Sequence, residues 1–193
     1  MKLLKRLKKL DKLYYTTSDI RKIENYSEGS LYVVLSRLVN RGELIRLTSG
    51  IYILPERYGE IEKIANVLYT PSYLSFESAL SKYGIVSQIP YTLSYATTRK
   101  TRKTSLGQYP VEYRKIRSDL FFGYRQRDDG VFIATAEKAL FDIFYFVSLG
   151  KLPFDFTSLD VRDVDMKTTV RYITTYLKPL SVKMKQILVE IHS

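Results

Sequence analysis

The stretch RGELIRLTSGIYIL, residues 41–54, consists of two short apolar runs separated by a Thr-Ser-Gly turn. Apolar residues alternate with other residues in both runs, and Gly50 supplies the backbone freedom that a tight turn needs. We therefore predict a β-hairpin with one apolar face. The residues expected on that face are Ile45, Leu47, Ile51 and Ile53. The residues expected on the other face and at the tip are Arg46, Thr48 and Ser49.

Helical patterns precede this hairpin. In the first, leucines recur at helical spacing, at Leu3, Leu7, Leu10 and Leu13, with lysines between them. Such a segment is typical either of the first helix of a small bundle or of a basic helix lying on a membrane. Its direct continuation into further elements favours the bundle. A short helix is then expected through Ile20 and Ile23, with Thr17 or Ser18 as its N-cap.

The third pattern, SEGSLYVVLSRLVNRG at residues 27–42, places apolar residues on one face and a mixed set on the other. The apolar face comprises Leu31, Val34, Leu35 and Leu38. The opposite face comprises Gly29, Val33, Ser36, Arg37 and Asn40, and Gly42 is expected to end the helix. Three helices followed by a two-stranded ribbon is the order of a winged helix-turn-helix, in which the third helix enters the major groove of DNA.

The charge of the chain agrees with a polyanionic partner. Lys and Arg number 31 against 20 acidic residues, a net charge of +11 over 193 residues. Residues 1–58 alone carry twelve basic and six acidic residues, a net charge of +6. From this pattern we expect double-stranded DNA as the partner, and a protein-docking winged helix remains the alternative.

Composition argues against several other classes. The chain has no Cys and its single His is His192, so thiolate zinc sites and disulfides are excluded and histidine-based catalysis is not expected. A metal-dependent nuclease needs clustered carboxylates, yet no Asp lies between Asp19 and Asp119. We expect no enzyme activity, no cofactor and no metal. Lysines interrupt the leucines of the first segment, and no apolar run approaches the roughly 18 residues of a membrane span, so a soluble cytoplasmic protein is expected.

A second domain is predicted to follow, with residues 1–58 forming the first and residues 59–193 the second. We expect helices over 60–69, from Ser75 to Gly84 and over 136–147. Short β-branched or aromatic runs over 92–98, 109–116 and 131–134 predict a small antiparallel sheet. The tail, residues 152–193, is expected to be helical, with one helix through Ile173 and another through Ile187. The fold class is therefore α+β.

A basic cluster lies in this domain, in the sequence TTRKTRK at residues 97–103. It contains Arg99, Lys100, Arg102 and Lys103, and we place it at a hairpin tip. Arg114, Lys115 and Arg117 on the returning strand are expected to add charge to it. The cluster is either a solvated tip or a phosphate-binding surface. The chain also has 17 Tyr and no Trp, but Tyr32, Tyr52, Tyr69 and Tyr145 lie in apolar patterns and are expected to pack rather than to stack on bases.

Several motifs resemble the AbiEi antitoxin family of type IV toxin–antitoxin systems, which act in phage resistance. They are SFESALSKYG (75–84), IP (89–90), TTRKTR (97–102), LFFG (120–123) and IATAEKALFDIFY (133–145). The resemblance spans roughly residues 15–147, and relatives usually have Pro where Ala136 stands. It implies a winged-helix autorepressor that binds inverted repeats in its own promoter, as a monomer that binds DNA cooperatively. It also implies antagonism of a nucleotidyltransferase-like toxin, generally without a stable complex; a stand-alone regulator is the alternative.

The residues expected to contact DNA form two groups. On the second and third helices and the hairpin they are Lys22, Val33, Ser36, Arg37, Asn40, Arg41, Arg46, Thr48 and Ser49. In the second domain they are Arg99, Lys100, Arg102 and Lys103. Helix side chains are assigned to bases, and Lys22 with the hairpin residues is assigned to phosphates.

Overall fold

The structure, a computed structural model, describes residues 2–24 and 26–177. The chain divides into two compact units. The first holds the described residues up to Ala65, together with Ser105–Tyr109. The second holds Asn66–Thr104 and the described residues from Pro110 onward. Both helices and sheets are present, which confirms the mixed α+β class.

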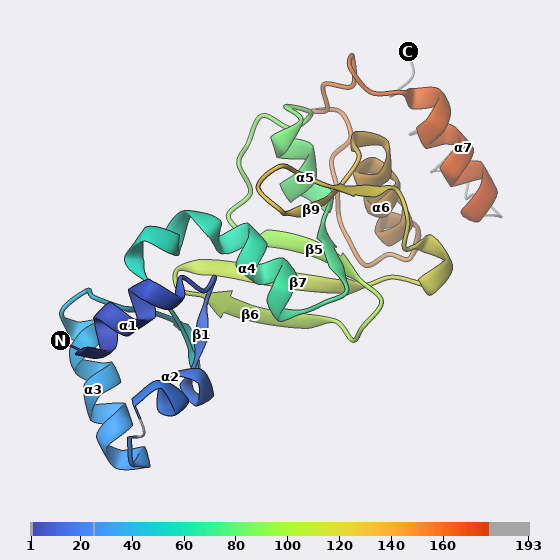
Figure 1. The fold of residues 1–193 in the computed structure, drawn as a ribbon. Coiled ribbons are helices and arrows are strands. Elements are labelled where there is room, and N and C mark those ends of the chain that lie inside the picture. The colour runs from blue at the N-terminus through green and yellow to red at the C-terminus, as the bar shows by residue number, and fades with distance from the viewer. Residues whose placement is uncertain (1, 25, 178–193) are drawn as a thin grey trace. The chain divides into compact units, whose positions relative to one another are not determined.

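The first unit is built around three helices and a small sheet (Figure 1). Its elements are α1 (Lys2–Leu10), β1 (Tyr15–Thr16), α2 (Thr17–Glu24), α3 (Glu28–Asn40), β2 (Ile45–Thr48), β3 (Ile51–Ile53) and the 3-10 helix η1 (Pro55–Glu60). Helix α4 (Ile61–Leu68) follows and ends before Thr70-Pro71, as predicted. The predicted hairpin is confirmed as the antiparallel pair β2 and β3. Its sheet has a third strand that was not predicted, β1, which pairs with β3.

The prediction of a single apolar face on the hairpin was incomplete. Tyr52 of β3 is buried and joins the core formed with the helices, although it was expected to alternate away from Ile51 and Ile53. Leu47 and Ile53 are also buried, so both faces of the ribbon are covered. One cause lies within the same unit, because the backbone N–H of Gly107 donates to the Leu47 carbonyl at 2.8 Å. Gly50 adopts φ 73°, as the turn required.

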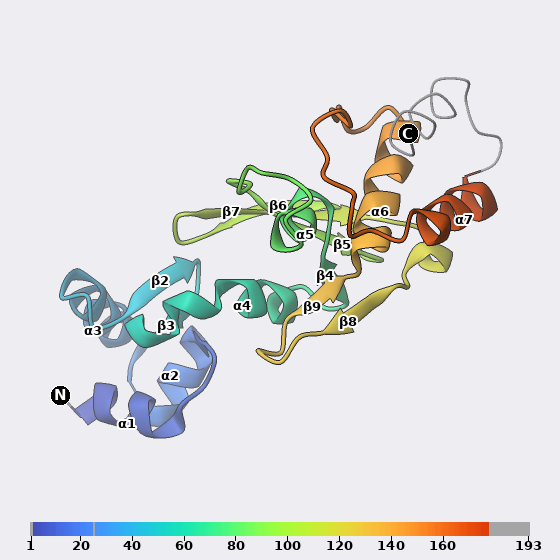
Figure 2. The same cartoon turned by 90° about the horizontal axis from the view of Figure 1, so that it is seen from above.

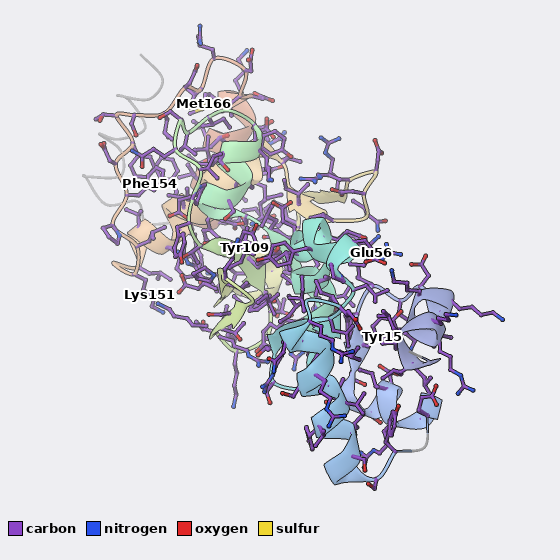
Figure 3. The ribbon with its side chains drawn as sticks, turned by 90° about the vertical axis from the view of Figure 1, so that its left-hand side faces the viewer. Tyr15, Glu56, Tyr109, Lys151, Phe154 and Met166 are labelled. Atoms are coloured by element: carbon purple, nitrogen blue, oxygen red, sulfur yellow. The ribbon has the colours of Figure 1, made fainter. Side chains whose placement is uncertain are left out.

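Tyr15 lies at the centre of the first unit's core (Figure 3). Its ring is fully buried, and its hydroxyl donates to the Leu7 carbonyl at 2.6 Å, which ties β1 to α1. Leu3 and Leu7 are buried in the same cluster, which supports α1 as a bundle helix. Leu10 is the last residue of α1 and does not join this core: Asp11 turns to φ 45°, and the Leu10 side chain is 49% exposed.

Side chains cap the N-termini of α2 and α3. The predicted N-cap of α2, Thr17 or Ser18, was wrong, because Thr16 caps the helix. The Asp19 N–H donates to Thr16 Oγ1 at 3.0 Å, and the Thr16 N–H donates to Asp19 Oδ2 at 2.9 Å. This reciprocal arrangement is a capping box. In α3, Ser27 Oγ accepts from the Ser30 N–H. Gly42, with φ 68°, follows the end of α3 as predicted.

The second unit is a six-stranded sheet with helices (Figure 2). Its elements are β4 (Ser72–Leu74), α5 (Phe76–Lys82), β5 (Leu93–Thr97), β6 (Arg102–Leu106), β7 (Tyr109–Lys115), η2 (Ser118–Leu120), β8 (Tyr124–Gln126), β9 (Phe132–Ala134), α6 (Ala136–Ser148) and α7 (Met166–Tyr176). The strand order is β6-β7-β5-β4-β9-β8. The predicted small antiparallel sheet was wrong: β5 pairs with β7 and β4 with β9 in parallel, so the sheet is mixed. The strands β4, β6 and β8 were not predicted.

A buried ion pair fixes α6 in the second unit. Lys138 and Asp142, one turn apart on α6, are both fully buried, and the ammonium donates to Asp142 Oδ1. The other oxygen, Oδ2, accepts from Ser75 Oγ at 2.7 Å and from Tyr73 Oη at 3.0 Å. Ser75 stands at the N-cap position of α5, but its hydroxyl bonds to Asp142 rather than to the backbone of α5. Burial lowers the pKa of Lys138, an effect that Asp142 opposes.

The predicted first tail helix is confirmed as α7, with Ile173 buried. The helix predicted through Ile187 lies outside the described residues. None of the helices over residues 2–24 and 26–177 combines the length and the apolar character needed to cross a bilayer.

Candidate nucleic-acid interface

The outer face of α3 is exposed, as the sequence predicted. Leu31, Leu35 and Leu38 are each 1% exposed and hold the helix against the core. The predicted base-contacting residues Val33, Ser36, Arg37 and Asn40 are all exposed, and so is Arg41 at the C-cap. The structure therefore leaves this predicted set on the surface of the first unit, clear of its core.

Tyr32 is the most exposed of the four tyrosines that were expected to pack. It was expected to pack in the core or at its boundary because it stands among Leu31, Val33 and Val34, and 52% of it is exposed. Its position is about 100° around the helix from Leu31, at the border between the buried and exposed faces. Helical spacing, rather than the local run of apolar residues, is the signal that would have placed it there. The packing expected for Tyr52, Tyr69 and Tyr145 is confirmed, since each is buried.

The hairpin presents Arg46 and Ser49 as exposed residues and Thr48 as half-buried. A register shift between Arg46 and Thr48 bends β2 just before the turn. The turn is fastened to the start of α2, because the Thr17 N–H donates to the Gly50 carbonyl at 2.9 Å. Lys22, the remaining predicted contact in this unit, is exposed on α2. The tip is thus held in a defined position by the same helix that carries Lys22.

The charges of the first unit are unevenly paired. Acids neutralise cations of α1, the segment after it and η1. The pairs are Arg6–Glu24 (3.3 Å), Lys8–Glu56 (3.8 Å), Lys12–Asp19 (2.9 Å) and Arg57 with both Asp11 and Glu60 (2.5 Å each). The Thr16 N–H and then Lys12 lower the pKa of Asp19 to about 2, so that this acid is ionised at neutral pH. Across the described residues, no ion pair involves Lys22, Arg37 or Arg46.

The basic cluster of the second unit is not a hairpin tip. Arg99 and Lys100 lie between β5 and β6, whereas Arg102 and Lys103 lie on β6, a strand at the edge of the sheet. The strand was missed because its residues, RKTSL, are mostly polar, which is common for edge strands. All four side chains are exposed.

The segment that carries this cluster is braced by hydrogen bonds. Tyr69 Oη donates to the Lys100 carbonyl at 2.8 Å, and the Lys115 N–H donates to Thr101 Oγ1 at 3.1 Å. The guanidinium carbons of Arg99 and Arg102 lie 4.3 and 5.6 Å from the centroid of the Tyr69 ring. This ring therefore positions two cations at the surface.

The charge expected from the neighbouring strand is mostly cancelled. Arg114 pairs with Glu112 at 3.0 Å and with Glu77 at 3.5 Å, and Arg117 pairs with Asp119. Lys103 itself lies 3.4 Å from Glu112 but is 78% exposed on its side chain. Lys115 is exposed and adds to the cluster as predicted. The predicted contacts thus form two sets, one in each unit.

The part of the chain that the structure describes contains no group of three or more His, Cys, Asp or Glu that would hold a metal ion. Comparison with known proteins adds no relative: no protein-family model matches the chain, and no curated protein is significantly similar to it.

Proposed function

We propose that the chain is a DNA-binding transcriptional autorepressor whose first unit is a winged helix-turn-helix. The order α1, α2, α3, β2, β3 supports this proposal, since β2 and β3 would be the wing and α3 the recognition helix. The exposed outer face of α3 would lie in the major groove. Arg46 and Ser49 on the wing, with Lys22 on α2, would contact phosphates.

The observation that carries the proposal is the distribution of ion pairs in the first unit. Arg6 and Lys8 of α1 and Arg57 of η1 pair with acids. Lys22, Arg37 and Arg46, like Lys5 and Lys9 of α1, make no ion pair with any residue in the described parts of the chain. Exposed cations that lack acidic partners are available to neutralise an external anion. Lys22, Arg37 and Arg46 lie on α2, α3 and β2, the elements that a winged helix applies to a duplex.

A gel-shift titration of the full chain on duplex DNA from its own promoter tests this function. If about six phosphates are neutralised, affinity should fall by on the order of 10³ between 50 and 200 mM salt. Arg37→Ala should lower affinity for the specific duplex by about 1–3 kcal/mol and relax sequence preference, while Arg46→Ala should weaken all duplexes alike.

Lys8→Ala is the matched control, because Lys8 already faces Glu56. A flat salt response, or equal effects of Lys8→Ala and Arg46→Ala, would contradict DNA binding through α3 and the wing. Retained binding of a protein partner under those conditions would instead identify a docking module.

The motif resemblance supports a more specific role, that of the antitoxin of a type IV system. In this role the chain would bind inverted repeats cooperatively as a monomer, and its second unit would antagonise a nucleotidyltransferase-like toxin without a stable complex. The proposal includes no catalytic step, cofactor or membrane. Co-expression with a nucleotidyltransferase encoded beside the chain tests it: growth should be restored, also by a variant that no longer binds the promoter. If neither the unaltered chain nor this variant restores growth, the alternative of a stand-alone regulator is favoured.

A further inference from the structure

Helix α3 exposes an apolar side chain, Val33, on the side opposite its core face. Val33 is 50% exposed, and Tyr32 beside it is 52% exposed. Val33 lies about 160° around the helix from Leu31, so it points away from the apolar core that Leu31 joins. A β-branched residue is also a poorer helix former than Ala or Lys at such a position, because its χ1 rotation is restricted. Neither packing nor helix stability accounts for Val33.

Gly29, one turn before Val33, is likewise not required by packing within the fold. A Cβ built on Gly29 would have no heavy atom within 4 Å, so the fold does not need glycine there. Glycine in a helix costs about 0.5–1 kcal/mol relative to Ala. Because glycine has no side chain, another molecule can approach the start of α3 closely. The first turns of a recognition helix are the part that meets base edges.

The residues around Val33 match the chemistry of the major groove. Arg37 follows one turn later and Asn40 two turns later, both exposed on the same side. Arg pairs with the N7 and O6 acceptors of guanine, Asn pairs with adenine, and an apolar side chain fits the 5-methyl group of thymine. Four residues advance a helix by about 6 Å, so Val33 and Arg37 would contact positions within about two base pairs of each other.

We infer that Val33 recognises the 5-methyl group of a thymine in the major groove, within about two base pairs of the guanine that Arg37 contacts. The inference rests on the proposed DNA-binding function and deepens it by naming the base feature that α3 reads. A duplex is the occupant that fits this face, because Arg37, one turn from the valine on the same helix, has no acidic partner among the described residues.

The test uses the full chain and duplexes that it selects from a random DNA library. Each thymine of the selected half-site is replaced in turn by uracil, which removes only the methyl group and keeps the base pair. Affinity should fall about fourfold at one thymine, the effect of about 0.8 kcal/mol for one buried carbon. The Val33→Ala variant should bind the thymine duplex more weakly than the unaltered chain does. It should bind the thymine and uracil duplexes with equal affinity.

Val67→Ala is the matched control, because Val67 is 47% exposed on α4 and lies outside this face. It should retain the full preference for thymine. Circular dichroism should show that Val33→Ala folds, as expected for an exposed site. Failure to select any duplex would overturn both this inference and the proposed function. Selection of a duplex with no uracil effect, or a uracil effect that persists in Val33→Ala, would overturn this inference alone.

Discussion

Replacing Lys138 by Met would leave the carboxylate of Asp142 buried without its ionic partner. Both side chains are fully buried, so water cannot take the place of the ammonium. Methionine keeps most of the length and apolar stem of lysine, so the change in packing is small. The perturbation therefore isolates the charge.

The expected loss of stability depends on the hydrogen bonds that Asp142 keeps in the variant. Removing one member of a buried pair costs about 3–5 kcal/mol. Asp142 Oδ2 would still accept from Ser75 and Tyr73, so we expect the lower end, about 3 kcal/mol, for Lys138→Met. In Lys138→Met/Asp142→Asn no charge remains, and the double variant should be less destabilised than the sum of the single variants by about 2 kcal/mol.

Urea unfolding of the full chain, followed by circular dichroism, measures these values. The two units are expected to unfold in separate transitions, and only the transition of the second unit should move. Lys167→Met, at an exposed position on α7, is the control and should change stability by less than about 0.5 kcal/mol. A loss below about 1 kcal/mol for Lys138→Met would refute the reasoning that the pair is an obligatory buried unit.

Further predictions concern the first unit and the basic cluster. Gly29→Ala should stabilise the first unit by about 0.5 kcal/mol, since the added Cβ meets no atom, yet weaken binding to duplex DNA; a stabilised variant with unchanged affinity would show that the start of α3 is not close to DNA. Asp19→Asn should cost about 1 kcal/mol at pH 7 by weakening the capping box of α2. Because the folded-state pKa of Asp19 is lowered to about 2, this stabilisation is present above pH 4 and is lost as the pH falls toward 2, so the unfolding midpoints of the two proteins should converge there. Replacing Arg99, Lys100, Arg102 and Lys103 by Ala should weaken binding to all duplexes alike and flatten the salt dependence; unaltered affinity in a gel shift would indicate that the cluster is only solvated.

The first unit could be predicted closely because its signals are local. Leucine spacing placed α1 and α3, Gly42 marked the end of α3, and Gly50 marked the hairpin turn. The pairing of Tyr52 with Tyr15 was not predictable in this way, since β1 is distant in sequence from β3. The same holds for the parallel pairing of β5 with β7, because no local pattern specifies which strand lies beside which.

Residues of the second unit's motifs surround the buried Lys138–Asp142 ion pair. Ser75 comes from one motif and the neighbours Phe122 and Gly123 from another, and all three contact the Lys138–Asp142 pair. Ser75 bonds to Asp142, and the Phe122 centroid lies 5.0 Å from the Lys138 ammonium nitrogen. Gly123 has φ 69°, and a Cβ there would lie only 3.0 Å from Lys138 Cγ, so a larger residue would strain the backbone and crowd Lys138. These motif residues pack around a buried ion pair, so they did not predict which residues lie on the surface of the second unit.

The position of Arg102 and Lys103 on β6 has a consequence for self-association. As the first strand in the sheet order, β6 leaves one backbone edge without a neighbouring strand among the described residues. Such an edge can pair with the same edge of another molecule. Two copies aligned in this way would bring their arginines and lysines together, and the repulsion would oppose the pairing. The alanine variant of the basic cluster should therefore show more light scattering at high concentration than the unaltered chain.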